Sequence, residues 1–128
     1  MTIKRFEDIR AWQEARKLTK HVYSLCKASP GLRRDRRLRD QMQAASVSIM
    51  SNIAEGFSRR TDKEFTQFLF VAKASAAEVQ SLLYVALDQE YVTEKDFSAL
   101  YEMADDVARL TSGFITSLLR QSPRPRPK

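Results

Sequence analysis

Apolar residues recur every three or four positions along four stretches of the chain, which is the spacing of one face of an α-helix. The pattern predicts helices over residues 8–28, 35–57, 62–89 and 94–120. A helix of about 25 residues is about 37 Å long, and the short connections between the segments force neighbouring helices to run antiparallel. The sequence therefore predicts an all-α fold, an antiparallel up-down-up-down four-helix bundle.

Local signals at the helix ends agree with these boundaries. Pro30 and Gly31 favour a turn that breaks the chain after the first helix. The segments 61–64 (TDKE) and 93–96 (TEKD) have the form of capping boxes, in which the threonine hydroxyl accepts a hydrogen bond from a backbone N–H three residues on. Gly56 either ends the second helix as its C′ residue or is followed by one more turn.

The second and third predicted helices have apolar residues on two opposite faces, which a monomeric bundle does not need. No charged residue occurs in 41–54, and residues 66–86 hold only Lys73 and Glu78. A helix that is apolar nearly all round is buried nearly all round, so the sequence predicts a homo-oligomer that associates through these two helices. The alternative is that the alanine-rich faces are simply neutral. The predicted interface consists of Val47, Ser51, Ala54, Phe70, Ala74, Ala77, Ser81, Tyr84 and Val85.

Polar residues border the two apolar faces. Ser48, Asn52 and Glu55 fall on one ridge of the second helix, and Glu78 has the comparable position on the third. If neighbouring subunits close over this ridge, its members must satisfy one another, since each unpaired buried polar group costs about 1–3 kcal/mol. We interpret the ridge as structural. The alternative is acid–base catalysis by Glu55 and Glu78, but no nucleophile, phosphate loop or metal partner accompanies them, so no catalytic residue is assigned.

Composition and charge narrow the class of protein. The 128 residues carry a net charge of +6, and the pI near 9.7 favours an anionic partner. Residues 1–120 are assigned to the bundle and residues 121–128 (QSPRPRPK) to a disordered basic tail. One cysteine and one histidine allow neither an internal disulfide nor a multi-histidine metal site. We therefore expect no metal and no cofactor.

The N-terminal residues lack the apolar stretch of a signal peptide. No uninterrupted apolar run of about 18 residues is present to cross a membrane. We expect a soluble, cytoplasmic protein with no membrane partner.

One end of the predicted bundle gathers an excess of positive charge. It holds the N-terminal segment, the connection between the second and third helices, and the end of the fourth. Its cations, the predicted nucleic-acid-binding residues, are Lys4, Arg5, Arg59, Arg60, Lys63, Arg120, Arg124 and Arg126, with Lys128 beside them. The carboxylates there are Glu7, Asp8, Asp62 and Glu64. Repeated around a ring, this excess makes a strong positive field for a polyanion.

Five arginines at the start of the second helix form a second-choice anion site. They are Arg33, Arg34, Arg36, Arg37 and Arg39. Cations at a helix N-terminus oppose the helix dipole, so these arginines are not expected to stabilise the helix. Together with the free backbone N–H groups, they could hold a phosphate. The predicted topology, however, brings the acidic connection between the third and fourth helices to this end. Surface ion pairing therefore explains these arginines as well as nucleic acid does.

The same residues carry a resemblance to a known family. The segments RFEDIRAWQEARKLTKHVY, LRDQMQAASVSIMSNIAEGFSRRTDKEFTQFL and AEVQSLLYVALDQEYV resemble the four-helix-bundle family of 23S rRNA intervening-sequence proteins. The match spans residues 6–92, within which NIAEG followed by KEF is fairly specific, and the fourth helix and the tail match only in character. The chain departs from the common pattern at SIMSN, where proline is usual before Ser-Asn, and at KASAAE, where Gly-Ser is usual before the glutamate.

The resemblance implies a homo-oligomeric, typically pentameric, ring of bundles without enzymatic activity. That family also includes the accessory variability protein of diversity-generating retroelements, and the retroelement members are similar to basic nucleic-acid binders that cooperate with a reverse transcriptase. The candidate partners are therefore other copies of this chain, RNA or DNA, and a reverse transcriptase or other protein. We expect a non-enzymatic oligomer that binds RNA or DNA backbone. The alternative is a scaffold or adaptor that binds another protein, its charge serving only solubility.

Overall fold

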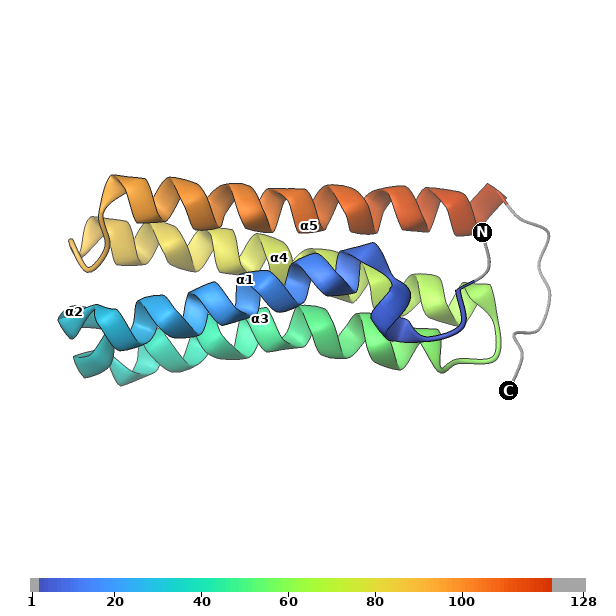
Figure 1. Cartoon of the computed structure of the whole chain (residues 1–128), viewed down its shortest axis with the longest axis horizontal. Coiled ribbons are helices and arrows are strands. Elements are labelled where there is room, and N and C mark those ends of the chain that lie inside the picture. The colour runs from blue at the N-terminus through green and yellow to red at the C-terminus, as the bar shows by residue number, and fades with distance from the viewer. Residues whose placement is uncertain (1–2, 121–128) are drawn as a thin grey trace.

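Helices joined by short turns make up residues 3–120, the part of the chain that the computed structural model describes (Figure 1). The elements in order are η1 (Phe6–Asp8, a 3-10 helix), α1 (Arg10–Ala28), α2 (Pro30–Arg34), α3 (Arg36–Phe57), α4 (Asp62–Asp88) and α5 (Glu94–Arg120). The predicted all-α fold is confirmed, and the four predicted helices correspond to α1, α3, α4 and α5. The tail predicted over residues 121–128 lies outside the described residues.

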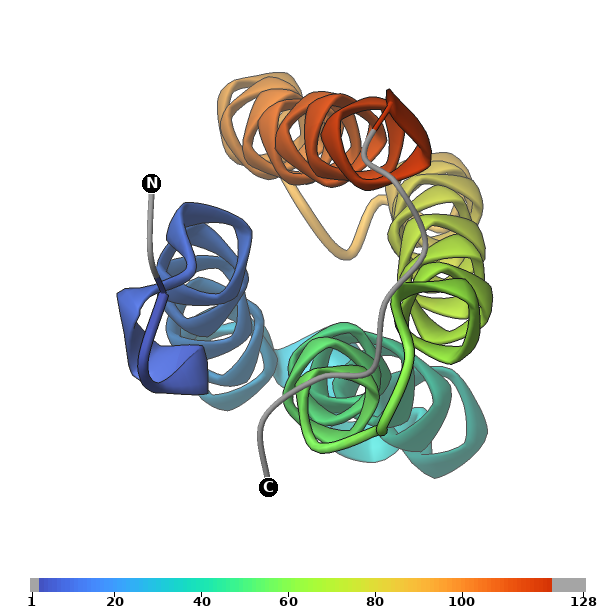
Figure 2. The ribbon, with the colours of Figure 1, turned by 90° about the vertical axis from the view of Figure 1, so that its right-hand side faces the viewer.

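The four long helices form a bundle in which each runs antiparallel to its neighbours (Figure 1). Viewed along the bundle, α1 and α4 occupy opposite corners, and α3 and α5 occupy the other two (Figure 2). Both α3 and α5 pack against α1 and α4. One end of the bundle therefore holds the α3–α4 turn and the end of α5, and the other holds α2 and the α4–α5 turn (Figure 1).

The core forms where the apolar stripes of the helices meet. Burial of each large aliphatic side chain contributes about 1.5–3 kcal/mol. Phe65 of α4 adds edge-on contacts with Phe57 and Phe114, with ring centroids 6.0 and 5.3 Å apart. The inward-facing residues of α3 are buried as the periodicity predicts: Leu38, Met42, Ala45, Ile49 and Ile53.

The turn predicted after the first helix is instead the short helix α2, which corrects the sequence-based expectation. Pro30 occupies the first turn of α2, where its missing N–H is not needed. Ser29 is the N-cap, and its Oγ accepts a hydrogen bond from the Leu32 backbone N–H at 3.1 Å. Pro30 therefore starts a helix here as well as ending one.

Tyr91, in the turn between α4 and α5, ties that turn to α2. Its carbonyl accepts a hydrogen bond from Ser29 Oγ (2.8 Å), and its hydroxyl donates to Asp35 Oδ2 (3.1 Å), which raises the pKa of Tyr91. Its ring fills the space beside Gly31, where a β-carbon would overlap Tyr91 Cδ1. Glu90, with φ 61°, adopts the left-handed conformation that ends α4.

Gly56 lies inside α3, which settles the alternative left open by the sequence. The helix continues to Phe57, and Gly56 has no positive φ. A β-carbon on Gly56 would fall 2.6 Å from Phe68 Cβ and 2.8 Å from Phe65 Cδ1. Gly56 is therefore a site of close approach between α3 and α4 and not a helix-ending residue.

The two predicted N-caps are present. Thr61 Oγ1 accepts a hydrogen bond from the Glu64 N–H at 3.1 Å and contacts Glu64 Oε1 at 3.2 Å. Thr93 Oγ1 accepts from the Asp96 N–H at 3.1 Å. These contacts satisfy backbone donors that the first turns of α4 and α5 leave without intrahelical partners.

Candidate functional site

The outward sides of α3 and α4 form an exposed apolar surface. We call it the α3–α4 apolar face and define it as the nine predicted interface residues together with Val71. Eight of those nine are exposed, and Ala54 is half-buried. The largest exposures are those of Phe70 (53%), Val71 (50%) and Tyr84 (50%). Contiguous apolar patches of this kind mark interaction sites in soluble proteins.

Among the described helices, α4 is the one long and apolar enough to cross a membrane by length and composition. Core helices of soluble proteins pass the same test. Only 33% of the most apolar window of α4 is buried within the chain. Much of the apolar surface of α4 therefore has no cover from the rest of residues 3–120.

The predicted polar ridge divides into two parts. Ser48 Oγ lies 2.9 Å from Ser75 Oγ of α4. The Asn52 amide donates to the Ser48 carbonyl (2.8 Å) and hydroxyl (3.0 Å). Glu55 and Glu78 are exposed. Ser48 and Asn52 thus form a network across the α3–α4 contact, in which Ser75 is a member that sequence reasoning missed.

Six of the predicted nucleic-acid-binding residues fall within the described chain, and the remaining two, Arg124 and Arg126, lie outside it. The topology brings the α3–α4 turn and the end of α5 to one end of the bundle (Figure 1). Arg5 Nη2 lies 2.6 Å from Glu7 Oε2, and this hydrogen bond lowers the pKa of Glu7. The exposed cations of this end, which we call the basic end, are Lys4, Arg5, Arg60, Lys63 and Arg120.

Arg59 is held against the protein and is less available to a ligand. Its guanidinium lies over the Phe68 ring, 4.5 Å from the centroid, and its Nη2 is 3.2 Å from Glu55 Oε1. Its Nε is buried and finds no hydrogen-bond partner among the described residues. Arg59 therefore braces the α3–α4 turn, a role that the sequence did not indicate.

Two arginines of the second-choice anion site, Arg33 and Arg39, stabilise helix ends. This corrects the expectation that the arginines of that site do not contribute to stability. Arg33 Nη1 donates to the Lys27 carbonyl at 3.1 Å, in the last turn of α1. Arg39 Nη1 donates to the Arg33 carbonyl at 3.0 Å, and Arg39 Nε to Asp40 Oδ1 at 3.2 Å. Cations near helix C-termini are favourable. Because the sequence did not predict α2, it did not reveal these carbonyl acceptors.

A model of the family described as "23S rRNA-intervening sequence protein" matches residues 7–113. The chain belongs to this family. The resemblance inferred from residues 6–92 is thereby confirmed. A solved structure from Bacteroides thetaiotaomicron, described as a protein with unknown function from the S23 ribosomal protein family, aligns with a TM-score of 0.74. The alignment has 18% sequence identity and covers 82% of this chain and 97% of that chain. Such a likeness shows the fold alone. No curated protein matches the chain.

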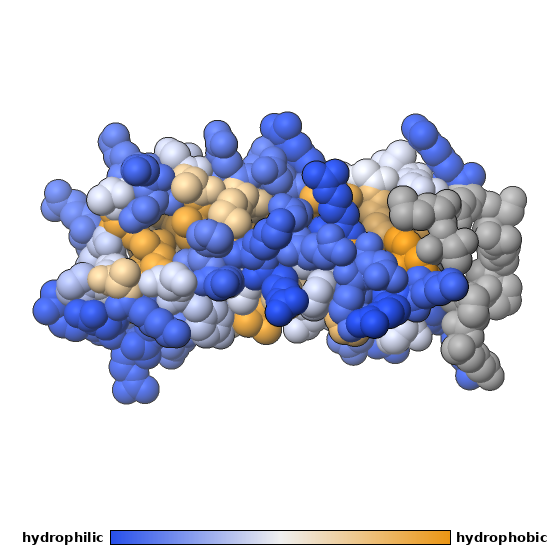
Figure 3. Space-filling view, viewed as in Figure 1, coloured by the Kyte–Doolittle hydropathy of each residue, from blue (hydrophilic) through white to orange (hydrophobic). Residues whose placement is uncertain are grey.

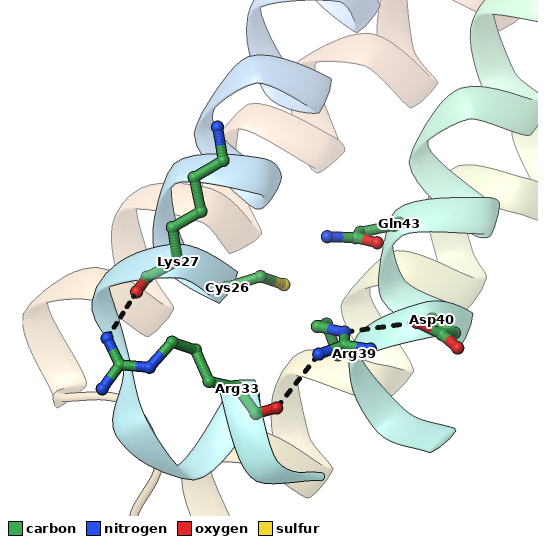
Figure 4. Close-up of a pocket in the computed structure, with 6 residues that line it drawn as sticks. All are labelled: Cys26, Lys27, Arg33, Arg39, Asp40 and Gln43. Carbon is green, nitrogen blue, oxygen red and sulfur yellow. Dashed lines mark hydrogen bonds and ion pairs between the residues drawn. The ribbon is translucent and has the colours of Figure 1, made fainter. Parts of the chain in front are cut away.

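In this member of the 23S rRNA-intervening sequence family, a hollow of about 370 Å³ lies where α1, α2 and α3 meet (Figure 4). The Cys26 sulfur, the Gln43 amide and the Arg39 guanidinium point into the space between α1 and α3 (Figure 4). Burial raises the pKa of the Cys26 thiol, so the thiol stays protonated near neutral pH. The lining residues are Cys26, Lys27, Arg33, Arg39, Asp40 and Gln43.

Within residues 3–120, this family member brings together no group of three or more histidine, cysteine, aspartate or glutamate residues that could hold a metal ion. The polar groups of the hollow are mostly hydrogen-bond donors. They suit an anion or a hydrogen-bond acceptor better than a cation.

Proposed function

We propose that the chain is a non-enzymatic, homo-oligomeric bundle that binds the phosphate backbone of RNA or DNA. The observation that carries the binding is the basic end, where three separate parts of the chain contribute exposed lysine and arginine side chains. Contacts from such side chains to phosphate hold a nucleic acid with little sequence preference. The family description names 23S rRNA, a nucleic acid.

The α3–α4 apolar face supports the oligomer. Its exposed aromatic and aliphatic side chains border a row of small residues on α4, which would let a helix of another copy approach closely. Burial of this face between neighbouring copies removes apolar area from water, at about 25 cal/mol per Å². In proteins that the sequence resembles, the ring typically has five copies. A closed ring would repeat the basic end around one rim, and the positive electrostatic fields of the copies would add.

The proposal is tested by charge reversal at the basic end. In the double variant Arg60→Glu with Lys63→Glu, Arg59 keeps its packing on Phe68. Its affinity for a labelled duplex, measured by fluorescence anisotropy, should fall by roughly tenfold or more. The slope of log K against log salt should shrink by about 0.9 for each phosphate of duplex DNA that the variant no longer binds.

The matched control is Arg34→Glu with Arg36→Glu, at the opposite end of the bundle. Both side chains are exposed, whereas Arg33 and Arg39 have structural hydrogen bonds and are left unchanged. Loss of binding in the control and retention in the basic-end variant would show that the wrong end was chosen.

A second candidate function, a scaffold or adaptor, is favoured by the exposure of Phe70 and Tyr84. Aromatic side chains are enriched in protein–protein interfaces. In that case the wild-type protein would show no salt-dependent binding to mixed RNA or DNA. The α3–α4 apolar face would then bind a different protein.

A further inference from the structure

Positive charge is distributed unequally between the two halves of the chain. Residues 3–61 hold fourteen lysine and arginine residues against six carboxylates, whereas residues 62–120 hold five against ten. The first half contains α1, α2 and α3, and the second contains α4 and α5. Within α1 itself, five cations accompany one acid, Glu14.

The outer side of α1 carries a row of cations. At 100° per residue, Arg16, Lys20, Tyr23 and Lys27 fall within about 60° of one another on the helix. All four are exposed, Tyr23 by 37%, and no carboxylate lies among them. We call these residues, with Arg33, the α1 basic face. The side of the molecule along which α1 runs is largely hydrophilic (Figure 3). The inward residues of α1, all buried, are Ala11, Ala15, Leu18, Val22 and Cys26.

Two contacts position cations at the ends of the α1 basic face. The Arg16 guanidinium lies 5.9 Å from the centroid of the Trp12 ring. At the other end, the hydrogen bond from Arg33 to the Lys27 carbonyl brings the Arg33 guanidinium beside the last turn of α1. The hollow described above, with Arg39 in its wall, opens there (Figure 4). The face from Arg16 to Lys27 is about 16 Å long.

The place of α1 in the bundle leaves this face accessible in an oligomer. α1 and α4 lie at opposite corners (Figure 2). Copies that associate through the outward sides of α3 and α4 therefore leave the outer side of α1 exposed. The α1 basic face and the α3–α4 apolar face can act at the same time.

We propose that the α1 basic face binds a single strand of nucleic acid along the length of α1. Phosphates contact Arg16, Lys20, Lys27 and Arg33, and a base stacks on the exposed ring of Tyr23, as aromatic side chains do in grooves for single strands. The hollow, at about 370 Å³, is in the size range of small-ligand sites and takes an unpaired base, which a duplex does not offer. The inference rests on the proposed function, and specifies its strand type and surface.

The test uses a fluorescein-labelled 20-nucleotide oligo(U) and the full-length protein. The double variant R16Q/K20Q should bind roughly tenfold or more weakly than the wild type, and its salt slope should shrink by about 0.7 for each of the two phosphates that it no longer neutralises. The control K95Q/R109Q removes one lysine and one arginine from exposed positions of α5. K95Q/R109Q has the same net charge as R16Q/K20Q, but it should bind oligo(U) as tightly as the wild type does. Circular dichroism checks that both variants are helical.

A second variant, Y23A, separates stacking from charge. It should weaken binding of oligo(U) by about fivefold or more and leave the salt slope unchanged, because every phosphate keeps its cation. Binding of a duplex of the same length should not change. An equal loss of affinity for duplex and single strand would contradict a base stacked on Tyr23.

The outcomes separate this inference from the proposed function. If R16Q/K20Q binds oligo(U) as tightly as the wild type while R60E/K63E does not, the α1 basic face is the wrong surface and the proposed function stands. If the wild type binds neither oligo(U) nor a duplex, both proposals are wrong. Binding to phosphatidylserine vesicles but not to oligo(U) would assign the face to a membrane and overturn the inference.

Discussion

Of the two glycines within the long helices, Gly56 packs against α4, whereas a β-carbon on Gly113 would meet no heavy atom within 4 Å other than its chain neighbours and the backbone of its own helix. The two positions therefore separate helix propensity from packing. Glycine in a helix is less favourable than alanine by about 0.5–1 kcal/mol. At Gly56, the neighbouring Phe65 and Phe68 leave no space for the methyl group of alanine, so the higher helix propensity of alanine cannot stabilise the helix there.

Gly56→Ala is expected to lower the free energy of unfolding by about 1–3 kcal/mol, because overpacking pushes α3 and α4 apart. Gly113→Ala is expected to raise it by about 0.5–1 kcal/mol. Urea denaturation at one fixed protein concentration measures both, since association itself shifts apparent stability. Stabilisation by both substitutions would show that the contact at Gly56 relaxes without strain.

At the scale of elements, the long helices were predictable and the short one was not. The inward faces of α1, α3, α4 and α5 follow a period that many residues repeat, so single exceptions do not hide it. α2 has five residues, too few to show a period, and its Pro-Gly start has the form of a turn. Its existence depends on the Ser29 cap and on Tyr91, which is distant in sequence.

In the candidate sites too, the periodic features were predictable and the features that depend on contacts distant in sequence were not. The α3–α4 apolar face was predictable because it is a second periodic stripe. The structural roles of Arg33, Arg39 and Arg59 depend on carbonyls, a carboxylate and a ring that only the folded chain brings near. The row of cations on α1 was not among the sequence-based predictions, because its accessibility follows from the position of α1 opposite α4 in the folded chain.

Ser29→Ala tests how far one cap supports α2. The hydroxyl both accepts from the Leu32 N–H and donates to the Tyr91 carbonyl, so its removal should lower the free energy of unfolding by about 1.5–3 kcal/mol. Thr93→Ala removes an exposed cap with one backbone partner and should lower it by about 0.5–1 kcal/mol. Thermal or urea unfolding monitored by circular dichroism compares the two; equal losses of stability would contradict a role for the bond to Tyr91.

At the scale of the whole molecule, the apolar and charged surfaces divide the bundle between them. Much of the α3–α4 apolar face is exposed in the protomer, the basic end lies at one extremity, and the α1 basic face lies along the side opposite α4. The proposed self-association and the proposed binding of a polyanion would therefore use different residues.

Ala74→Glu is expected to dissociate the proposed oligomer into folded protomers. Ala74 is exposed in the protomer, so the substitution is compatible with the fold, but in the proposed interface it buries a charge at a penalty of several kcal/mol. Ala99→Glu, on an exposed position of α5, is the control and should leave the oligomer intact. Light scattering gives the masses. A wild-type protein that is monomeric at micromolar concentration would exclude the interface.

The unequal charge of residues 3–61 and 62–120 also bears on how the chain reaches its structure. These halves form two helical hairpins, α1–α3 and α4–α5, and the core is complete only when the two hairpins pack together. Their opposite net charges attract across solvent, over a range that dissolved salt shortens to about 10 Å at 0.1 M. Refolding followed by stopped-flow fluorescence of Trp12 should therefore become slower as sodium chloride is added at low concentration.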